Sequence, residues 1–465
     1  MQQAQAFATV LSPSSGRTLR PIAAKYRLRL AFILGASACW IALLPPGTAA
    51  AQNPTLDQMQ ALIAAQQKQI ELQQQQIEAQ RRALEKLQTD VTAMQKAAPA
   101  AGATAAGATV AGTTAAAPAK EGPPEVTSGV PRVQLSISGQ VNKMINVVND
   151  GEGTDTFFVD NQNSTSRVRF VGTGRISPDL TIGSRIELGI RPNSSNLVSQ
   201  DDQDAGDSFD QRVVEAFVED KTYGRVLLGK GSTAADNAHE VDLSGTDVAT
   251  YASISDLAGG MQFRNSAGAL TGITFAEAFT DFDGSRRDRL RYDSPVFSGF
   301  TLSGAMISDE RWDSALFWTG QNETWKAGAA AAFQQPNLSG VDYRYGGSFS
   351  VLHKPTGLNL TASAGSDARV DNDAYNFFVK AGWQERFWDI GLTSFSLDYT
   401  YSGSALLNGA SVRGDGQSVG LYAVQNLAEY GVDFYGGLRW LTVNPDTSLD
   451  LQDMTIFSMG TRVKF

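Results

Sequence analysis

Apolar and polar residues alternate along the chain from Arg132 onward, with a repeat of two. In the first such stretch the apolar set is Val133, Leu135, Ile137, Gly139 and Val141, and the residues between them are polar. The same alternation returns over 180–191 and over 395–402. A period of two predicts a β-strand with one apolar face and one polar face. We therefore expect the region 132–465 to be all β.

Connections between these predicted strands are of two lengths. Short turns occur at 177–179 and 354–357, whereas 149–164 and 192–210 are long and polar. Short turns at one end and long loops at the other are typical of transmembrane β-barrels, whose strands face lipid on one side and a polar lumen on the other. With strands of about 10 residues and connections of about 10, the region accommodates about 16 antiparallel strands, and about 14 or about 18 also fit. The alternative, a soluble β-sandwich, needs fewer strands.

The chain ends in an alternating stretch that closes on an aromatic residue, Met459-Gly460-Thr461-Arg462-Val463-Lys464-Phe465. A terminal Phe on such a strand resembles the C-terminal signature of bacterial outer-membrane barrels. It is the most specific local signal for this fold. We interpret 132–465 as an all-β transmembrane barrel of the Gram-negative cell outer membrane.

A different period, of seven, precedes the barrel. The a positions are Leu56, Ile63, Ile70, Ile77, Leu84 and Val91, and the d positions are Met59, Gln66, Gln73, Gln80, Leu87 and Met94. Apolar residues repeating every seven positions predict an α-helical coiled coil over 52–96, with glutamines in the middle of the seam. Isoleucine at a and glutamine at d favour three strands, and we expect the coil to lie in the periplasm. The alternative is a solvated glutamine-rich helix.

The residues on either side of the predicted coil lack the composition of a folded core. Region 97–131 is rich in Ala, Gly, Thr and Pro and is expected to be a flexible linker. Region 1–51 has basic residues, then the apolar run 30–44, then small residues, which predicts a secretory signal peptide. A single membrane anchor is the alternative. The stretch around Cys39 is a poor match to a lipoprotein site.

Composition narrows the function classes. Cys39 lies in the predicted signal peptide, so the exported chain has no thiol for a disulfide or a thiolate metal site. Without 1–51 the chain carries 33 Lys and Arg against 48 Asp and Glu, which makes nucleic acid a poor partner. His239 and His353 are the two histidines, and neither lies in a local catalytic pattern. We expect no enzyme activity and no cofactor.

Two sequence stretches carry a resemblance to a known family. Arg289–Pro295 followed by Phe297–Ala305 resembles the strand-turn-strand motif of Gram-negative general porins. In that family a barrel of 16 strands forms a trimer, and the third extracellular loop folds into the lumen. The N-terminal coiled coil together with Phe157–Asn161 is similar to DcaP-like porins. This closer resemblance implies a preference for anionic, dicarboxylate-type solutes.

Arginines in the predicted strands alternate with apolar residues, so they are expected to line the lumen, because a charge facing lipid costs about 2 to 4 kcal/mol near the midplane. The set is Arg167, Arg169, Arg185, Arg191, Arg212, Arg287, Arg289 and Arg291. Such a wall attracts anions. The alternative is that these arginines pair with lumen carboxylates such as Glu187 and Asp293 and stiffen the wall.

The stretch 231–260 is the candidate for the loop that folds into the lumen. Its acidic residues are Asp236, Glu240, Asp242, Asp247 and Asp256. Facing the arginines, these carboxylates would set a transverse field across a constriction. The alternative is an ordinary solvated extracellular loop. The acidic stretches 150–160 and 201–210 are expected at the surface, where divalent cations can bridge them to lipopolysaccharide.

The sequence thus predicts a passive outer-membrane channel for small hydrophilic solutes, with anions favoured. Outer-membrane lipid, lipopolysaccharide and further copies of the chain in a homotrimer are the expected partners. One alternative is a structural anchor or tether that uses the coiled coil toward the cell wall. An outer-membrane enzyme is the less favoured alternative.

Overall fold

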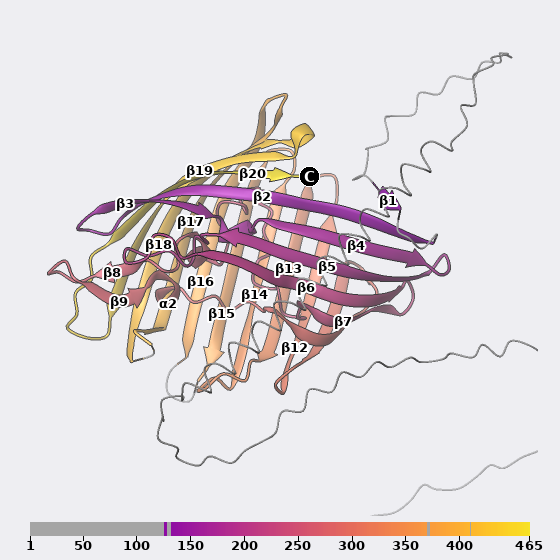
Figure 1. The fold of residues 1–465 in the computed structure, drawn as a ribbon, viewed down its shortest axis with the longest axis horizontal. Coiled ribbons are helices and arrows are strands. Elements are labelled where there is room, and N and C mark those ends of the chain that lie inside the picture. The colour runs from indigo at the N-terminus through magenta and orange to yellow at the C-terminus, as the bar shows by residue number, and fades with distance from the viewer. Residues whose placement is uncertain (1–124, 128–131, 370–372, 410) are drawn as a thin grey trace, which may run out of the picture. The chain divides into compact units, whose positions relative to one another are not determined.

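The computed structural model describes residues 125–127, 132–369, 373–409 and 411–465 (Figure 1). The predicted signal peptide, the coiled coil and nearly all of the linker lie outside these residues. In the part of the chain that is described, no helix has the length and apolar character needed to cross a membrane.

The described chain forms one large antiparallel sheet. It contains β1 (Glu125–Thr127), β2 (Val133–Asn149), β3 (Thr154–Asp160), β4 (Arg167–Arg175), β5 (Leu180–Pro192), β6 (Asp207–Asp220), β7 (Gly224–Ser232), β10 (Arg286–Asp293), β11 (Phe300–Ile307), β12 (Arg311–Gln321), β13 (Trp325–Gln335), β14 (Tyr343–His353), β15 (Leu358–Ala368), β16 (Ala374–Trp388), β17 (Gly391–Leu407), β18 (Val412–Leu427), β19 (Val432–Pro445) and β20 (Met454–Lys464). Apart from β3 and β4, which both pair with β2, each strand of this sheet pairs with the next one along the chain. Figure 1 shows β2–β7 crossing in front of β12–β16. Pairing of β2 with β20 closes the barrel.

The strand count of the closed barrel is 16, as the sequence predicts. The strands β3 and β4 share one position, because β2 pairs with β4 along its first half and with β3 along its second half. Between them 161–166 leaves the sheet and includes the short helix η1 (Gln162–Ser164). The strand β1 extends the sheet at β2, next to the point where β20 ends.

Alternation along the strands sorts side chains between the two faces of the wall. On β15, for example, Leu358 and Leu360 are exposed on the outer face, whereas Asn359 and Thr361 are buried on the inner face. Exposed aromatic side chains cluster on β12–β14, where Phe333 lies 5.7 Å from Trp312 and 5.1 Å from Tyr343, ring to ring. Aromatic belts of this kind mark the lipid-facing ends of outer-membrane barrels.

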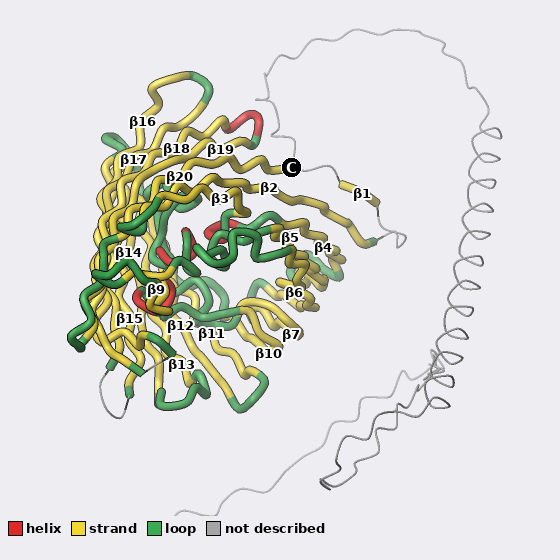
Figure 2. The backbone as a smooth tube through the Cα atoms, turned by 60° about the vertical axis from the view of Figure 1, so that its left-hand side comes forward, coloured by secondary structure: helices red, strands yellow, loops and turns green. Residues whose placement is uncertain are grey.

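The connection between β7 and β10, residues 233–285, is the longest in the described chain, and we call it the inner loop. It contains η2 (Ile254–Leu257), β8 (Gln262–Arg264), β9 (Leu270–Thr274) and α2 (Phe275–Ala278). Figure 2 shows these segments inside the ring of strands. The predicted range 231–260 covers only part of this connection, because Gly231 and Ser232 belong to β7 and the loop continues for a further 25 residues, to Ser285.

An apolar core lies inside the barrel, between the inner loop and one side of the wall. The loop contributes Val248, Ile254, Leu257, Met261, Phe263, Ile273, Phe275 and Phe279, and the wall contributes Met144, Val148, Phe157, Tyr422, Leu441, Val443, Met454 and Ile456. Inward positions of an outer-membrane barrel are normally polar. They are apolar on β2, β3 and β18–β20 because the loop packs on them. The inward faces of β4, β5, β6 and β10 instead carry the predicted arginines.

Candidate functional site

The wall formed by β4, β5, β6 and β10 is rich in arginine. Three of these residues converge on one buried carboxylate, that of Glu187 on β5. Arg169 lies 2.5 Å from Glu187, Arg212 lies 2.8 Å away and Arg167 lies 3.5 Å away, measured between nitrogen and oxygen. The register places them on neighbouring strands, since Arg169 lies opposite Glu187 across β4 and β5.

A second buried carboxylate, Glu215 on β6, serves two arginines. Arg185 lies 2.6 Å from it and Arg289 lies 2.5 Å from it. The Arg289 side chain is fully buried and also donates to the carbonyl oxygens of Gly229 and Ser232. A Cβ at Gly231 would lie 2.4 Å from Glu215 and 2.8 Å from Arg289, so glycine is needed there. Arg289 is therefore a brace between β10, β7 and β6, inaccessible to a passing solute.

The remaining predicted arginines also point inward. Arg191 pairs with Asp210 at 3.1 Å, and Arg291 pairs with Asp293 at 2.7 Å. Arg287 donates to the Ser285 hydroxyl at 3.2 Å. Most of the predicted arginines therefore pair with carboxylates, which is the alternative that the sequence offers for them.

Charge on this wall is nevertheless unbalanced. We call Arg167, Arg169, Arg185, Arg212 and Arg289 the arginine wall. These five arginines share two carboxylates, those of Glu187 and Glu215. Three positive charges are therefore left over. Arg169 is the most accessible member, with 41% of its side chain exposed.

The predicted acidic residues of the inner loop lie in different surroundings. Asp236 is 3.8 Å from Arg286, and Glu240 accepts a hydrogen bond from the Ser253 hydroxyl. Asp242 pairs with Lys380 on β16, on the far side of the lumen from the arginine wall. Asp247 is exposed. Asp256 accepts a 2.5 Å hydrogen bond from the Tyr251 hydroxyl.

Several of these carboxyl groups hold their protons more tightly than usual. Burial raises the pKa of Asp256 to about 7, against the opposing effects of the Tyr251 hydrogen bond and of the charges of Arg191 and Arg212. Burial together with neighbouring carboxylates raises the pKa of Glu240 and of Asp283. For Asp242 burial acts in the same direction, but Lys380 outweighs it and lowers the pKa.

Two buried cations that the sequence analysis did not single out hold the inner loop. Lys380 donates to Asp242 at 2.7 Å and to the carbonyl oxygen of Thr250 at 2.6 Å. Arg439 on β19 donates to Asp398 and to the Thr250 hydroxyl, both at 2.8 Å. The alternation of the strands places Lys380, Asp398 and Arg439 at inward positions. Their contact with the inner loop could not be predicted, because the loop is remote from them in sequence.

Comparison with known proteins gives the family. The profile of the Gram-negative porin family matches residues 102–445. Among solved structures, the anion-selective porin from Comamonas acidovorans is 18% identical, with 72% of this chain and 100% of that chain covered and a TM-score of 0.48. The outer-membrane channel DcaP of Acinetobacter baumannii is 11% identical, with 72% and 97% covered and a TM-score of 0.43. A comparison with curated protein sequences finds no match.

The family match spans most of the chain, including nearly all of the barrel. It confirms the resemblance to porins that the sequence motifs indicated. It also favours a channel that carries out no chemical reaction. The chain belongs to the Gram-negative porin family, whose members are channels of the outer membrane.

Proposed function

We propose that this porin is a passive channel for small hydrophilic solutes that favours anions, including dicarboxylates. One observation carries the proposal: the five residues of the arginine wall share only two carboxylates. Guanidinium groups bind carboxylates through paired, charge-assisted hydrogen bonds. The surplus around Glu187 is two positive charges, which matches the charge of a dicarboxylate.

The inner loop supports selection by charge as well as by size. It occupies the β18–β20 side of the lumen and leaves solutes the side that carries the arginines. The charges of Arg191 and Arg212 act on the Asp256 carboxyl group of the loop and lower its pKa. A passing solute therefore lies between opposite charges, where Coulomb interactions are stronger than in bulk water. No bond is made or broken, and the driving force is the concentration gradient.

Replacing Arg169 by glutamine tests the anion preference. We expect the reversal potential in a KCl gradient across a planar bilayer to shift toward cations, because the most accessible positive charge of the wall is lost. The matched control is Arg386→Gln, which removes an exposed arginine outside the arginine wall and should leave the reversal potential unchanged. Cation selectivity in the unmodified channel, insensitive to Arg169, would contradict the proposal.

The inner-loop carboxyl groups give the preference a pH dependence. Below a pH of about 7, Asp256 becomes neutral, and the raised pKa values of Glu240 and Asp283 act in the same direction. The arginines stay charged throughout. Anion preference, read from reversal potentials, is therefore expected to increase as the pH falls from about 8 to about 5. With Asp256→Asn the pH dependence should weaken, and an unchanged pH profile in that variant would count against the assignment.

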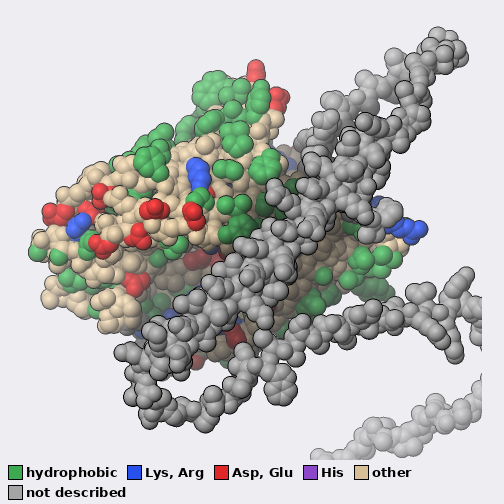
Figure 3. Space-filling view, viewed as in Figure 1, with side chains coloured by type: hydrophobic (Ala, Val, Ile, Leu, Met, Phe, Trp, Pro, Cys, Tyr) green, Lys and Arg blue, Asp and Glu red, His purple; other side chains and the backbone are tan. Residues whose placement is uncertain are grey.

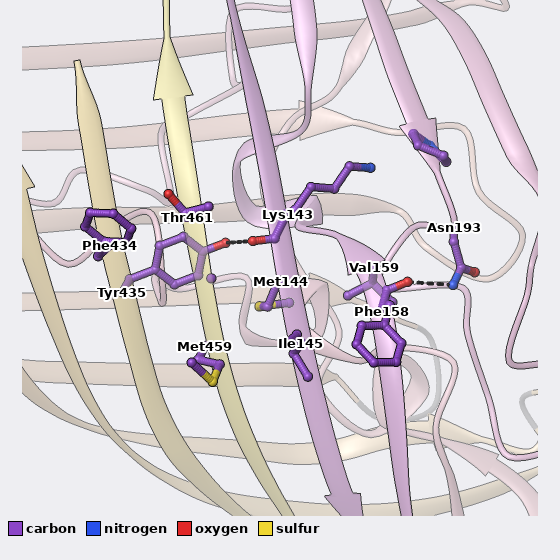
Figure 4. A pocket seen from close by; sticks show the side chains of 12 residues that line it. Lys143, Met144, Ile145, Phe158, Val159, Asn193, Phe434, Tyr435, Met459 and Thr461 are labelled. Carbon is purple, nitrogen blue, oxygen red and sulfur yellow. Dashed lines mark hydrogen bonds between the residues drawn. The ribbon is translucent and has the colours of Figure 1, made fainter. Parts of the chain in front are cut away.

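We further propose that the channel is a homotrimer and that the outer face of β2–β5 and β20 is covered by another copy. The residues 133–192 contain neither Trp nor Tyr, so this sector lacks the anchors found on β12–β19. Lys143, 45% exposed, pairs at 3.2 Å with the fully buried Asp160. Lys143 and the exposed Phe158 and Met459 line a hollow of about 700 Å³ (Figure 4). A charged pair at this apolar wall favours contact with protein over lipid.

The space-filling view shows this same side of the molecule, with an acidic region at one end of the barrel. Acidic side chains gather at the end of the barrel where β3 lies, and the visible wall beyond them is a mixture of hydrophobic and uncharged groups around one basic side chain (Figure 3). At that end, Arg264 of the inner loop pairs with Asp150 at 2.7 Å. A negative rim at the loop end fits the expected bridging of lipopolysaccharide by divalent cations.

A bulky residue on this face tests the trimer. A Cβ at Gly172 would meet Ser184 at 3.4 Å, an ordinary contact, so Gly172→Trp should fold but block a second copy. We expect loss of the oligomer in native mass spectrometry of detergent-solubilised protein. The control is Ala362→Trp on the outer face of β15, which should keep it. An intact oligomer in both variants, or none in the unmodified protein, would refute this interface.

A further inference from the structure

A second cavity lies in the lumen where the inward faces of β5, β7, β10, β11 and β12 meet the start of the inner loop. Its volume is about 370 Å³. Its charged lining residues are Arg185, Arg225, Arg289, Arg291, Asp236 and Asp293, and its apolar ones are Leu227 and Phe317. We call it the Phe317 cavity.

Two guanidinium groups of the Phe317 cavity have unused hydrogen-bonding capacity. The Nε atoms of Arg185 and Arg225 are buried and have no hydrogen-bond partner within the described ranges. Arg185 shares Glu215 with Arg289, and the nearest carboxylate oxygen to Arg225 belongs to Glu219, 3.9 Å away. The guanidinium of Arg225 lies 4.3 Å above the ring of Phe217, which orients it. Both side chains are also partly exposed, 27% for Arg185 and 31% for Arg225, so an anion in the cavity can reach their guanidinium groups.

The apolar part of the lining is out of place in a water-filled lumen. On β12 the other inward positions near Phe317 are Asp313, Ala315 and Thr319, which are polar or small. Apolar inward residues on β18–β20 are explained by the inner loop packed on them. Phe317 is not part of that core and keeps a partly exposed ring. Its presence fits a solute that brings apolar surface of its own.

We propose that the Phe317 cavity is a binding station for organic monoanions in which one carboxylate is joined to an apolar or aromatic body. The carboxylate binds Arg185 and Arg225, and the body lies against Phe317 and Leu227. The four arginines of the lining face three carboxylates, those of Asp236, Asp293 and the shared Glu215, so one positive charge is left over, which suits a single carboxylate. The inference deepens the proposed function, since it rests on anions entering the lumen, and it adds a second solute class to the dicarboxylates.

Current block in a planar bilayer tests the station, with sodium benzoate and sodium acetate as probes. We expect benzoate to reduce the current at a lower concentration than acetate. In Phe317→Ser the half-blocking concentration of benzoate should rise about two- to tenfold, the size of one aromatic contact, while that of acetate stays the same. In Phe317→Leu, which keeps apolar surface, the change should be smaller. In Arg185→Gln block by both anions should weaken.

The controls distinguish the binding station in the Phe317 cavity from the anion preference of the channel. Arg169→Gln should reduce the anion preference and leave the ratio of benzoate to acetate block intact. Equal block by the two anions in the unmodified channel, or a ratio unchanged by Phe317→Ser, would overturn the station. Block is measured on the total current, whichever ion carries it. A cation-selective channel that still shows the benzoate preference would overturn the anion proposal alone.

Discussion

Replacing Lys380 by methionine is expected to release the inner loop from the barrel wall and to make the open channel larger and noisier. Lys380 is completely buried, and its ammonium group makes hydrogen bonds to Asp242, Ser244, Thr246 and Thr250. Methionine fills a similar volume but offers none of these hydrogen bonds. The carboxylate of Asp242 is then left without its partner in a dry site. Removing one partner of a buried ion pair costs about 3 to 5 kcal/mol.

The cost falls on the loop segment that narrows the passage. Residues 242–250 are held to β16 by Lys380 and to β17 by the hydrogen bond from Thr246 to Ser396. Without the Lys380 ammonium group, this segment is expected to leave the wall part of the time. Single-channel recording should then show a higher mean conductance and larger current fluctuations than in the unmodified protein. Arg386→Gln, at the exposed end of β16, serves as the control for mutation in the same strand.

A double variant makes the test specific for the ion pair. Exchanging both charged residues for apolar ones, as in Lys380→Met with Asp242→Leu, removes the unpaired charge, and such exchanges are often neutral for stability. The double variant should therefore be quieter than Lys380→Met alone. If Lys380→Met has the conductance and noise of the unmodified channel, the ion pair does not hold the loop. If single and double variants are equally noisy, the hydrogen bonds and not the charge are decisive.

Much of the barrel could be predicted from the sequence, because strand alternation is a local property. The stretch 180–191 corresponds to β5 and 395–402 lies within β17, and the strand count agrees with the prediction. The break at 161–166 could not be predicted in this way. It depends on Asn161, which leaves the sheet to bind the Tyr435 hydroxyl and the carbonyl oxygen of Val248, both remote in sequence.

The candidate site was predicted as a set of residues but not as an arrangement. Alternation identifies Arg289 as inward-facing, and so it is, but only the register of β6, β7 and β10 shows that it is a buried brace. A neutral variant of Arg289 is therefore a test of stability, not of selectivity. One feature of the β2 sequence does indicate that a loop packs inside the barrel. Met144 and Val148 are apolar at inward positions, and Ile145 and Val147 are apolar at outward positions, which indicates a strand covered on both faces.

Replacing Glu215 by glutamine is expected to destabilise the barrel wall strongly. Glu215 and Arg289 are both fully buried, and Arg185 depends on the same carboxylate. Glutamine keeps the shape and one acceptor but removes the charge, so two guanidinium groups are left facing each other without a counterion. We expect a loss of about 3 to 5 kcal/mol in the free energy of unfolding. The measurement is urea unfolding of the barrel in detergent or lipid vesicles, followed by tryptophan fluorescence.

Glu187→Gln is the matched comparison, because it also removes a carboxylate shared by several arginines. Its partner Arg169 is 41% exposed, so water can solvate the charge that is released, and the loss of stability should be much smaller. The same variant adds net positive charge to the passage and should increase the anion preference. Equal destabilisation by the two substitutions would show that burial of Arg289 does not matter. A stable Glu215→Gln barrel with a shifted reversal potential would mean that Arg289 faces the solute after all.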